Sequence, residues 1–257
     1  MLRAYLAAAA AALAFGAAWI SPWAPAWAPP WAPGAGGCLA QELKAETKAA
    51  ESADAPPVYV PPRRGGPANV AAAATRSGSD ATPRLKLLAP AHTGLTVAAQ
   101  PTLYLYVAEP GTVRVRVMRA ASLADAPLAT GQIDVAAAPA IVPLSLLGLN
   151  ATLRPGTAYE VIVSMYDGRS GAMRGGDSAM IERVSEPAGL SAAQTGAPLA
   201  RARLFAKAGL WFDAVGAVSE AVNAAPASPA ARGHRAALLE QAGLGAIAEF
   251  DRKGPRG

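Results

Sequence analysis

The sequence predicts a mainly β protein with a C-terminal α part, in which a two-sheet β-sandwich is followed by a short helical segment. Three observations lead to this fold class. Short runs of alternating apolar and polar residues recur between residues 84 and 186. A Pro-Gly turn leads into one of these runs through Tyr159, and residues 187–249 are rich in Ala and Leu at helical spacing. Period-two runs indicate strands, and a 3.6-residue period indicates helices.

Seven short strands are expected in residues 84–186, the predicted β-sandwich domain. In Thr112–Arg119, three valines alternate with two arginines and a methionine, which is typical of a strand with one buried and one solvated face. About seven such strands in about 100 residues favour two packed sheets. The expected strands lie near Leu85–Leu88, Thr102–Val107, Thr112–Arg119, Leu128–Val135, Ile141–Leu147, Ala158–Tyr166 and Ala179–Val184.

One corner of the predicted sandwich carries a specific pattern. Leu153 precedes the turn Pro155-Gly156, and Thr157-Ala-Tyr159 then enters an alternating run. The pattern resembles the tyrosine corner of fibronectin type III and other immunoglobulin-like domains. In those domains the ring packs inward and the hydroxyl bonds upstream backbone. The resemblance implies an immunoglobulin-like sandwich in which Tyr159 has a structural role.

The helical segment, residues 187–249, carries a repeat-like spacing. Gly243 lies 34 residues after Gly209, and 34 residues is the period of the tetratricopeptide repeat. The segment resembles about one and a half such repeats, which is too few to form a stable unit alone. We therefore expect the helices to pack onto the sandwich, with Trp211 as a structural anchor.

The N-terminal residues 1–40 are predicted to be a secretory signal peptide. Arg3 is their only charged residue, and Ala4–Ile20 is apolar or small throughout. A short charged start, an apolar run and a small-residue cut site describe such a signal. A cut after Ala40 releases a periplasmic or secreted chain that starts at Gln41. The alternative is a protein anchored in the membrane by an uncleaved signal.

Two further ranges are predicted to be disordered. Residues 41–83 form a linker rich in Ala, Pro, Gly and charged side chains, which bury too little apolar surface to offset chain entropy. Residues 250–257 form a short tail. The one cysteine, Cys38, lies upstream of the expected cut, so no disulfide or thiolate chemistry is expected after cleavage.

The composition excludes several kinds of site. The net charge of +5 is too small to indicate nucleic-acid binding, which requires a clustered basic face. Two histidines, His92 and His234, stand apart from any acidic cluster, and the spacing of ligands typical of a metal site is missing. We expect no catalytic residues, no cofactor and no metal, and both histidines are predicted to lie on the surface.

The best candidate binding surface combines aromatic and cationic side chains from two neighbouring strands. If the intervening leucines face the core, Tyr104 and Tyr106 face outward, and the next strand exposes Arg114 and Arg116. Tyrosine and arginine are enriched where proteins bind partners. The alternative is that the two tyrosines lie beneath the helical segment, which must dock somewhere.

Several landmarks follow one another in a fixed order along the chain. They are Tyr59–Pro67, Thr75-Arg76, Gly94–Val97, Gln100–Tyr106, Leu153–Tyr159, Ile181–Val184 and Gly209–Ala214. In this order they are similar to a bacterial family of exported proteins, domain of unknown function 928. The resemblance runs from about Tyr59 to Gly245 and implies export and this architecture, without an activity.

These observations favour a non-enzymatic binding or structural module of the cell envelope. Its expected partner is an envelope protein or glycan, with no nucleic acid and no stable membrane insertion after signal cleavage. The sequence leaves the oligomeric state open. The alternative function is an envelope glycan hydrolase whose carboxylates lie on the β-sandwich, because sandwiches assemble sites from several strands.

Overall fold

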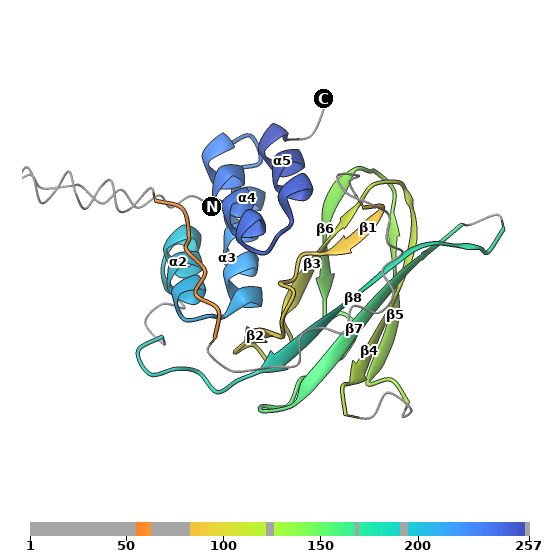
Figure 1. The fold of residues 1–257 in the computed structure, drawn as a ribbon, viewed down its shortest axis with the longest axis horizontal. Coiled ribbons are helices and arrows are strands. Elements are labelled where there is room, and N and C mark those ends of the chain that lie inside the picture. The colour runs from red at the N-terminus through yellow and green to blue at the C-terminus, as the bar shows by residue number, and fades with distance from the viewer. Residues whose placement is uncertain (1–54, 63–82, 122–125, 168–169, 191–194, 255–257) are drawn as a thin grey trace, which may run out of the picture. The chain divides into compact units, whose positions relative to one another are not determined.

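The structure is a computed structural model that describes residues 55–62, 83–121, 126–167, 170–190 and 195–254. The predicted signal peptide lies outside these residues. In the described ranges, two β-sheets precede four helices (Figure 1). The predicted fold class, mainly β with a C-terminal α part, is therefore confirmed. No helix within these ranges combines the length and the apolar character needed to cross a membrane.

The two sheets differ in size. The three-stranded sheet has the order β1-β3-β6, and the five-stranded sheet has the order β2-β8-β7-β4-β5. All neighbouring strands are antiparallel except β2 and β8, which run parallel. The bounds are β1 Leu85–Leu87, β2 Gly94–Thr96, β3 Thr102–Val107, β4 Gly111–Arg119, β5 Ala129–Val135, β6 Ala140–Ser145, β7 Ala158–Tyr166 and β8 Met173–Arg183.

The core between the sheets comes from alternate residues of their strands. Val113, Val115 and Val117 of β4 are each at most 1% exposed, while the arginines between them are exposed. β7 alternates in the same way along its whole length. Inward residues of the three-stranded sheet complete the core: Leu103, Leu105, Val107 and Leu144. The period of two thus determines which face of each strand is buried.

The predicted corner is present at the start of β7. Tyr159 is buried, and its hydroxyl accepts a hydrogen bond from the backbone N–H of Arg154 at 3.0 Å. Gly156 in the preceding turn has a φ of +68°, which suits glycine. The ring therefore fills the core while its polar end satisfies a backbone donor.

Tyr159→Phe is expected to lower the free energy of unfolding by about 1 kcal/mol, because it removes one hydrogen bond and leaves the Arg154 N–H without its partner. Denaturant unfolding of the two proteins measures the difference. Tyr166→Phe changes the same hydroxyl on a half-buried ring of the same strand and serves as the control. Equal stability of all three proteins would contradict the corner.

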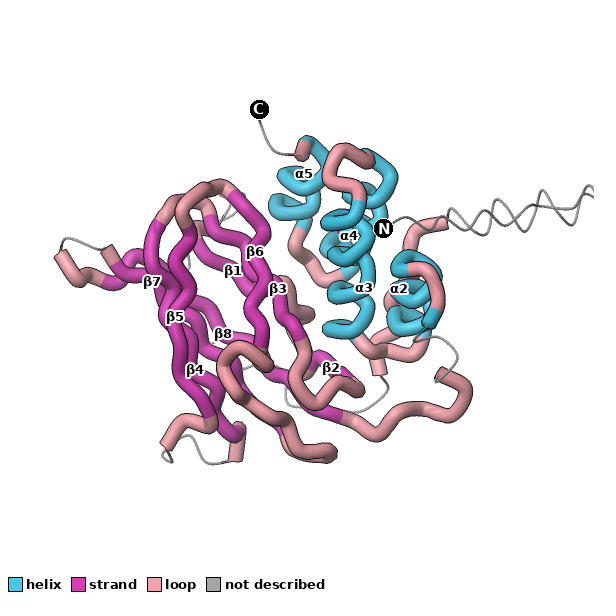
Figure 2. The backbone as a smooth tube through the Cα atoms, turned by 180° about the vertical axis from the view of Figure 1, so that it is seen from behind, coloured by secondary structure: helices cyan, strands magenta, loops and turns pink. Residues whose placement is uncertain are grey.

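Four helices follow the sheets in two antiparallel pairs (Figure 2). α2 (Pro198–Lys207) and α3 (Trp211–Ala224) form one pair, and α4 (Pro229–Gln241) and α5 (Gly245–Lys253) form the other. Proline occupies the first turn of α2 and of α4, and the Ser228 hydroxyl caps α4. Each pair is joined through a glycine with φ +76°, Gly209 or Gly243.

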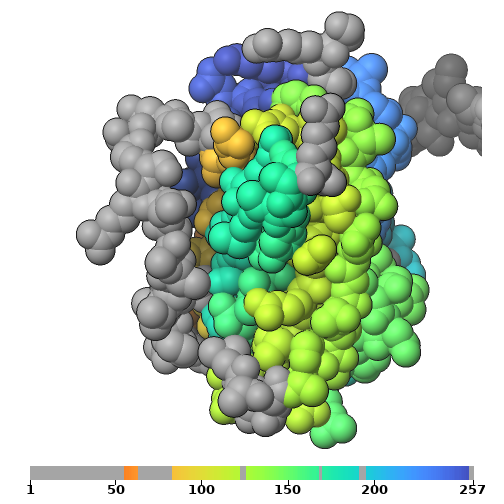
Figure 3. Space-filling model, turned by 90° about the vertical axis from the view of Figure 1, so that its right-hand side faces the viewer, coloured from red at the N-terminus to blue at the C-terminus, as the bar shows by residue number. Residues whose placement is uncertain are grey.

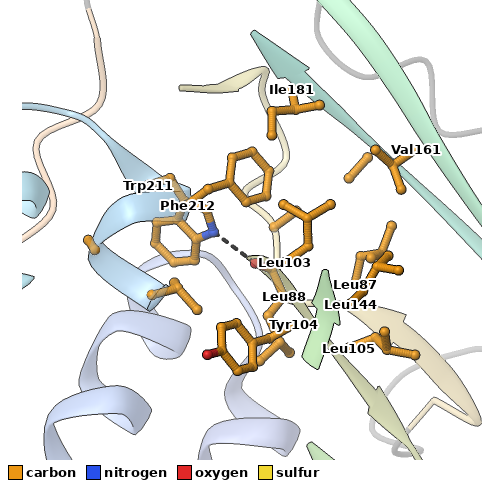
Figure 4. Close-up of a cluster of buried hydrophobic side chains, with 14 of the residues drawn as sticks. Leu87, Leu88, Leu103, Tyr104, Leu105, Leu144, Val161, Ile181, Trp211 and Phe212 are labelled. Atoms are coloured by element: carbon orange, nitrogen blue, oxygen red, sulfur yellow. Dashed lines mark hydrogen bonds between the residues drawn. The ribbon is translucent and has the colours of Figure 1, made fainter. Parts of the chain in front are cut away.

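The helices pack against the three-stranded sheet and β2 (Figures 1 and 4). Trp211 is fully buried, and its indole N–H donates to the carbonyl oxygen of Leu88 at 2.8 Å. Phe212 lies against Gly94, where a Cβ would come within 2.6 Å of the ring. Leu204 of α2 is 47% exposed, so it does not belong to this contact.

A buried ion pair fastens α5 to α4. The Arg235 guanidinium donates to both carboxylate oxygens of Asp251, at 2.6 and 2.8 Å, and also to the Ser219 hydroxyl of α3 at 3.3 Å. Phe250 packs edge-on against Tyr106 of β3. Because these contacts hold the last helix, α5 continues to Lys253, beyond residue 249, the predicted end of the helical segment.

Candidate ligand-binding face

The outward face of the five-stranded sheet carries Arg114 and Arg116 of β4. Both side chains are exposed because they alternate with the buried valines of that strand. Two residues along a strand separate side chains on the same face by about 7 Å. The sheet therefore presents two arginine side chains from successive outward positions of one strand. Figure 3 views this side of the β domain, with β8 in teal and β4 in yellow-green.

The strand register places small and polar side chains around the two arginines. Arg114 lies opposite Gln132 of β5 and Ser164 of β7. Arg116 lies opposite Thr130 and Ile162. Together these residues line an open depression of about 500 Å³. Among the residues that line the depression, only the two arginines are charged, and Thr130, Gln132 and Ser164 can form hydrogen bonds.

Tyr166 orients one of the cations. The Arg114 guanidinium carbon lies 4.4 Å from the centroid of the Tyr166 ring, within the range of a cation–π contact. Tyr166 ends β7 and faces outward because the alternate residues before it face the core. Tyr166 is not among the site residues predicted from the sequence, although the alternation of β7 indicates its outward direction.

The two arginines have no ion pair with any other described residue. Other cations on the β domain do: Lys86 pairs with Asp177 at 2.9 Å, and Arg174 pairs with Glu109 at 3.2 Å. Asp134 of β5 lies near Arg114 on the same face, but it accepts hydrogen bonds from Thr112 and Gln132. A ligand bound at the outward face would therefore meet two positive charges that are not held in an ion pair with a described residue. Such an arrangement can bind carboxylate, sulfate or phosphate groups through charge-assisted hydrogen bonds.

The structure does not bring Tyr104 and Tyr106 to this face. Both belong to β3 of the three-stranded sheet, and they are 7% and 4% exposed beneath the helices. Burial raises the pKa of both hydroxyls, and the Tyr104 hydroxyl bonds Ser219 of α3. Both point away from the core, as expected, but the helices cover them. The candidate surface is thus divided, and only its arginine half is available to a ligand.

A second depression, of about 580 Å³, lies between α3 and the segment that joins β2 to β3. Its lining includes Asp213, whose pKa is raised to about 6 by burial. The Asp213 carboxylate accepts a hydrogen bond from the Val97 N–H at 3.1 Å. Arg201 and Glu220, which also line the depression, form an ion pair with each other at 2.8 Å. Asp213 therefore joins the helices to the sheet, and its oxygens are engaged by protein groups.

Neither histidine is the surface residue that the sequence analysis expected. His234 on α4 is 6% exposed. His92 is half-buried, and its Nε2 lies 2.8 Å from the Tyr59 hydroxyl. Burial lowers the pKa of His92. Within the ranges that the structure covers, no three His, Cys, Asp or Glu side chains gather as metal ligands would.

The comparison with curated proteins returns no match. A family model matches residues 71–251, which include all eight strands and nearly all of the four helices. The match also includes the two arginines and the helices that bury Tyr104. The chain therefore belongs to the family described as Domain of Unknown Function (DUF928).

Proposed function

We propose that this protein is a non-enzymatic binding module of the cell envelope, and that the outward face of β4, β5 and β7 binds an acidic glycan. The observation that carries the proposal is the pair Arg114 and Arg116, which are exposed, adjacent on one strand and without a carboxylate partner among the described residues. The predicted signal peptide supports the location in the envelope.

The ligand class follows from the chemistry of the face. The Cα atoms of the two arginines lie about 7 Å apart along the strand, and each guanidinium group can bind one carboxylate of a repeating uronic acid chain. Thr130, Gln132 and Ser164 supply short hydrogen-bonding groups between and beside the two cations. The Tyr166 ring adds an apolar edge on which a sugar can pack. A flat, open sheet suits an extended polymer better than a small enclosed ligand.

The architecture supports a binding role as well. The Tyr159 corner and the two-sheet packing resemble immunoglobulin-like domains, and the two helix pairs with matched turn glycines resemble tetratricopeptide repeats. Both are scaffolds that present surfaces to partners. A fold alone assigns no function, so the proposal depends on the arginine face.

The alternative function, a glycan hydrolase, is favoured by one observation. Asp213 has the raised pKa that a general acid requires, and it lines a depression that also contains Glu220. Its hydrogen bond with the Val97 N–H, and its role in joining α3 to the sheet, argue against this role. Release of reducing ends from the glycan by the wild-type protein would support the hydrolase instead.

The Arg114→Ala/Arg116→Ala double variant is expected to bind an oligogalacturonate at least ten-fold more weakly than the wild type. Loss of about 1.4 kcal/mol accounts for a factor of ten, and a hydrogen bond to a charged group contributes about that much or more. Isothermal titration of the chain starting at Gln41 measures the affinity, which should also fall as salt is raised.

Arg119→Ala is the matched control. Arg119 is an exposed arginine of the same strand, but it is in phase with the inward valines and so does not share the face of Arg114 and Arg116. It should keep the wild-type affinity. A neutral glucan of the same length should not bind. Equal affinity of the double variant and the wild type for oligogalacturonate would refute the arginine face as the site.

A further inference from the structure

A short extended segment, residues 55–62, lies on the helices and is here named the strap. Its sequence is Ala-Pro-Pro-Val-Tyr-Val-Pro-Pro. It falls within residues 41–83, which the composition predicts to be a disordered linker. In Figure 1 it is the orange segment that runs along α2. It has no helical or strand structure of its own, so its position depends on the groups that contact it.

The helices hold the strap mainly through its backbone. The side-chain amide of Gln241 pairs with it twice: its Nε2 donates to the Pro57 carbonyl at 3.0 Å, and its Oε1 accepts from the Tyr59 N–H at 2.7 Å. The Val60 N–H donates to the Ala206 carbonyl at 3.0 Å. Backbone contacts of this kind recognise an extended peptide with little dependence on sequence.

One side chain supplies the specificity. Tyr59 is 7% exposed, whereas the neighbouring Val58 and Val60 are 65% and 50% exposed. The Tyr59 ring packs edge-on against Trp211, with centroids 4.9 Å apart, and stacks on His92. Its hydroxyl bonds His92. The prolines on both sides favour the extended backbone before binding, which lowers the entropy lost on docking.

Gly209 makes room for the strap where α2 ends. A Cβ at this position would lie 3.0 Å from the Val60 carbonyl oxygen, and the φ of +76° also requires glycine. Trp211, His92, Gln241 and Gly209 thus form a groove, here named the strap groove. Residues from both the β domain and the helices contribute to it.

We propose that the strap groove is a peptide-binding site, and that the strap is its intramolecular ligand. The intermolecular ligand of the strap groove is an extended segment of another chain that has a tyrosine flanked by prolines. The seated strap defines this chemistry, because each contact involves either peptide backbone or the tyrosine ring. Residues 63–82 join the strap to the β domain in the sequence, so the strap competes as a ligand within the same chain.

The test uses a fluorescein-labelled peptide with the sequence of residues 55–62 and the full mature chain. Tyr59→Ala empties the aromatic part of the strap groove. The peptide should bind this variant at least ten-fold more tightly than it binds the wild type, whose own strap competes. Fluorescence anisotropy measures binding. A peptide with alanine in place of tyrosine should not bind.

Val58→Ala is the matched control, since it alters an exposed side chain of the same segment and should exclude the peptide as the wild type does. A folded Tyr59→Ala variant that does not bind the peptide would overturn the proposal. If that variant does not fold, a protease site placed within residues 63–82 provides a second test. After cleavage, the strap fragment should dissociate on dilution and rebind on concentration, and a fragment that never dissociates would also overturn it.

Discussion

Removal of residues 198–257 is expected to make the β domain aggregate. The helices cover Tyr104, Tyr106 and Leu88, and their loss would expose a continuous apolar face of the three-stranded sheet. Exposed patches of this kind drive association of soluble proteins. Size-exclusion chromatography and light scattering of the truncated chain measure the effect. A soluble, monomeric β domain with the thermal midpoint of the whole protein would contradict the docking of the helices.

Trp211 reports the same contact without truncation. It is the only tryptophan after Trp31, so the chain starting at Gln41 has one indole. Because Trp211 is fully buried and bonded to the Leu88 carbonyl, its emission should be blue-shifted and shielded from iodide. Red-shifted, freely quenched emission from the folded monomer would show that the indole is in water.

The second large effect concerns the pH dependence of stability through Asp213. Its pKa in the folded protein is about 6, against an ordinary value of 3.8, because burial disfavours the charged form. Between these two values the folded state binds more protons than the unfolded state. The contribution of Asp213 to stability is therefore greatest below about pH 3.8 and falls as the pH rises through 6.

Asp213→Asn removes this dependence. Relative to the wild type, the variant should gain about 2 kcal/mol in the free energy of unfolding between pH 4.5 and pH 7.5. Urea denaturation of both proteins at both pH values measures the change, and comparing the two proteins cancels the groups that they share. A constant difference across this range would show that Asp213 has an ordinary pKa.

β3 and β7 begin and end at the expected residues. β7 alternates between buried and half-buried side chains, and β3 alternates between aliphatic and tyrosine side chains although both of its faces are buried. β2 was missed because it has three residues, all buried, so no alternation is visible. β8 begins six residues before the expected Ala179, at Met173, because Gly175 and Gly176 resemble a turn rather than a strand. Pairing with β7 stabilises this part of the strand despite the glycines.

The candidate binding surfaces could be predicted only in part. Alternation along β4 predicts that Arg114 and Arg116 point outward. Which element covers the three-stranded sheet depends on tertiary packing, which the alternation does not show. Tyr104 and Tyr106 are buried for that reason. The strap was predicted to be part of a linker because its composition has too few large apolar side chains to form a core. The groups that contact it, Trp211 and Gln241, lie far away in the sequence. Local composition contains no information about such contacts.

The most direct test of the proposed function is a nuclear magnetic resonance titration of the chain starting at Gln41 with oligogalacturonate. The arginine face predicts saturable shifts of the side chains or amides of Arg114, Arg116, Ser164 and Tyr166, with the resonances of Trp211 and Gln241 unchanged. Shifts confined to the strap groove, or saturable binding that leaves β4 and β7 unperturbed, would contradict the assignment of the ligand to this face.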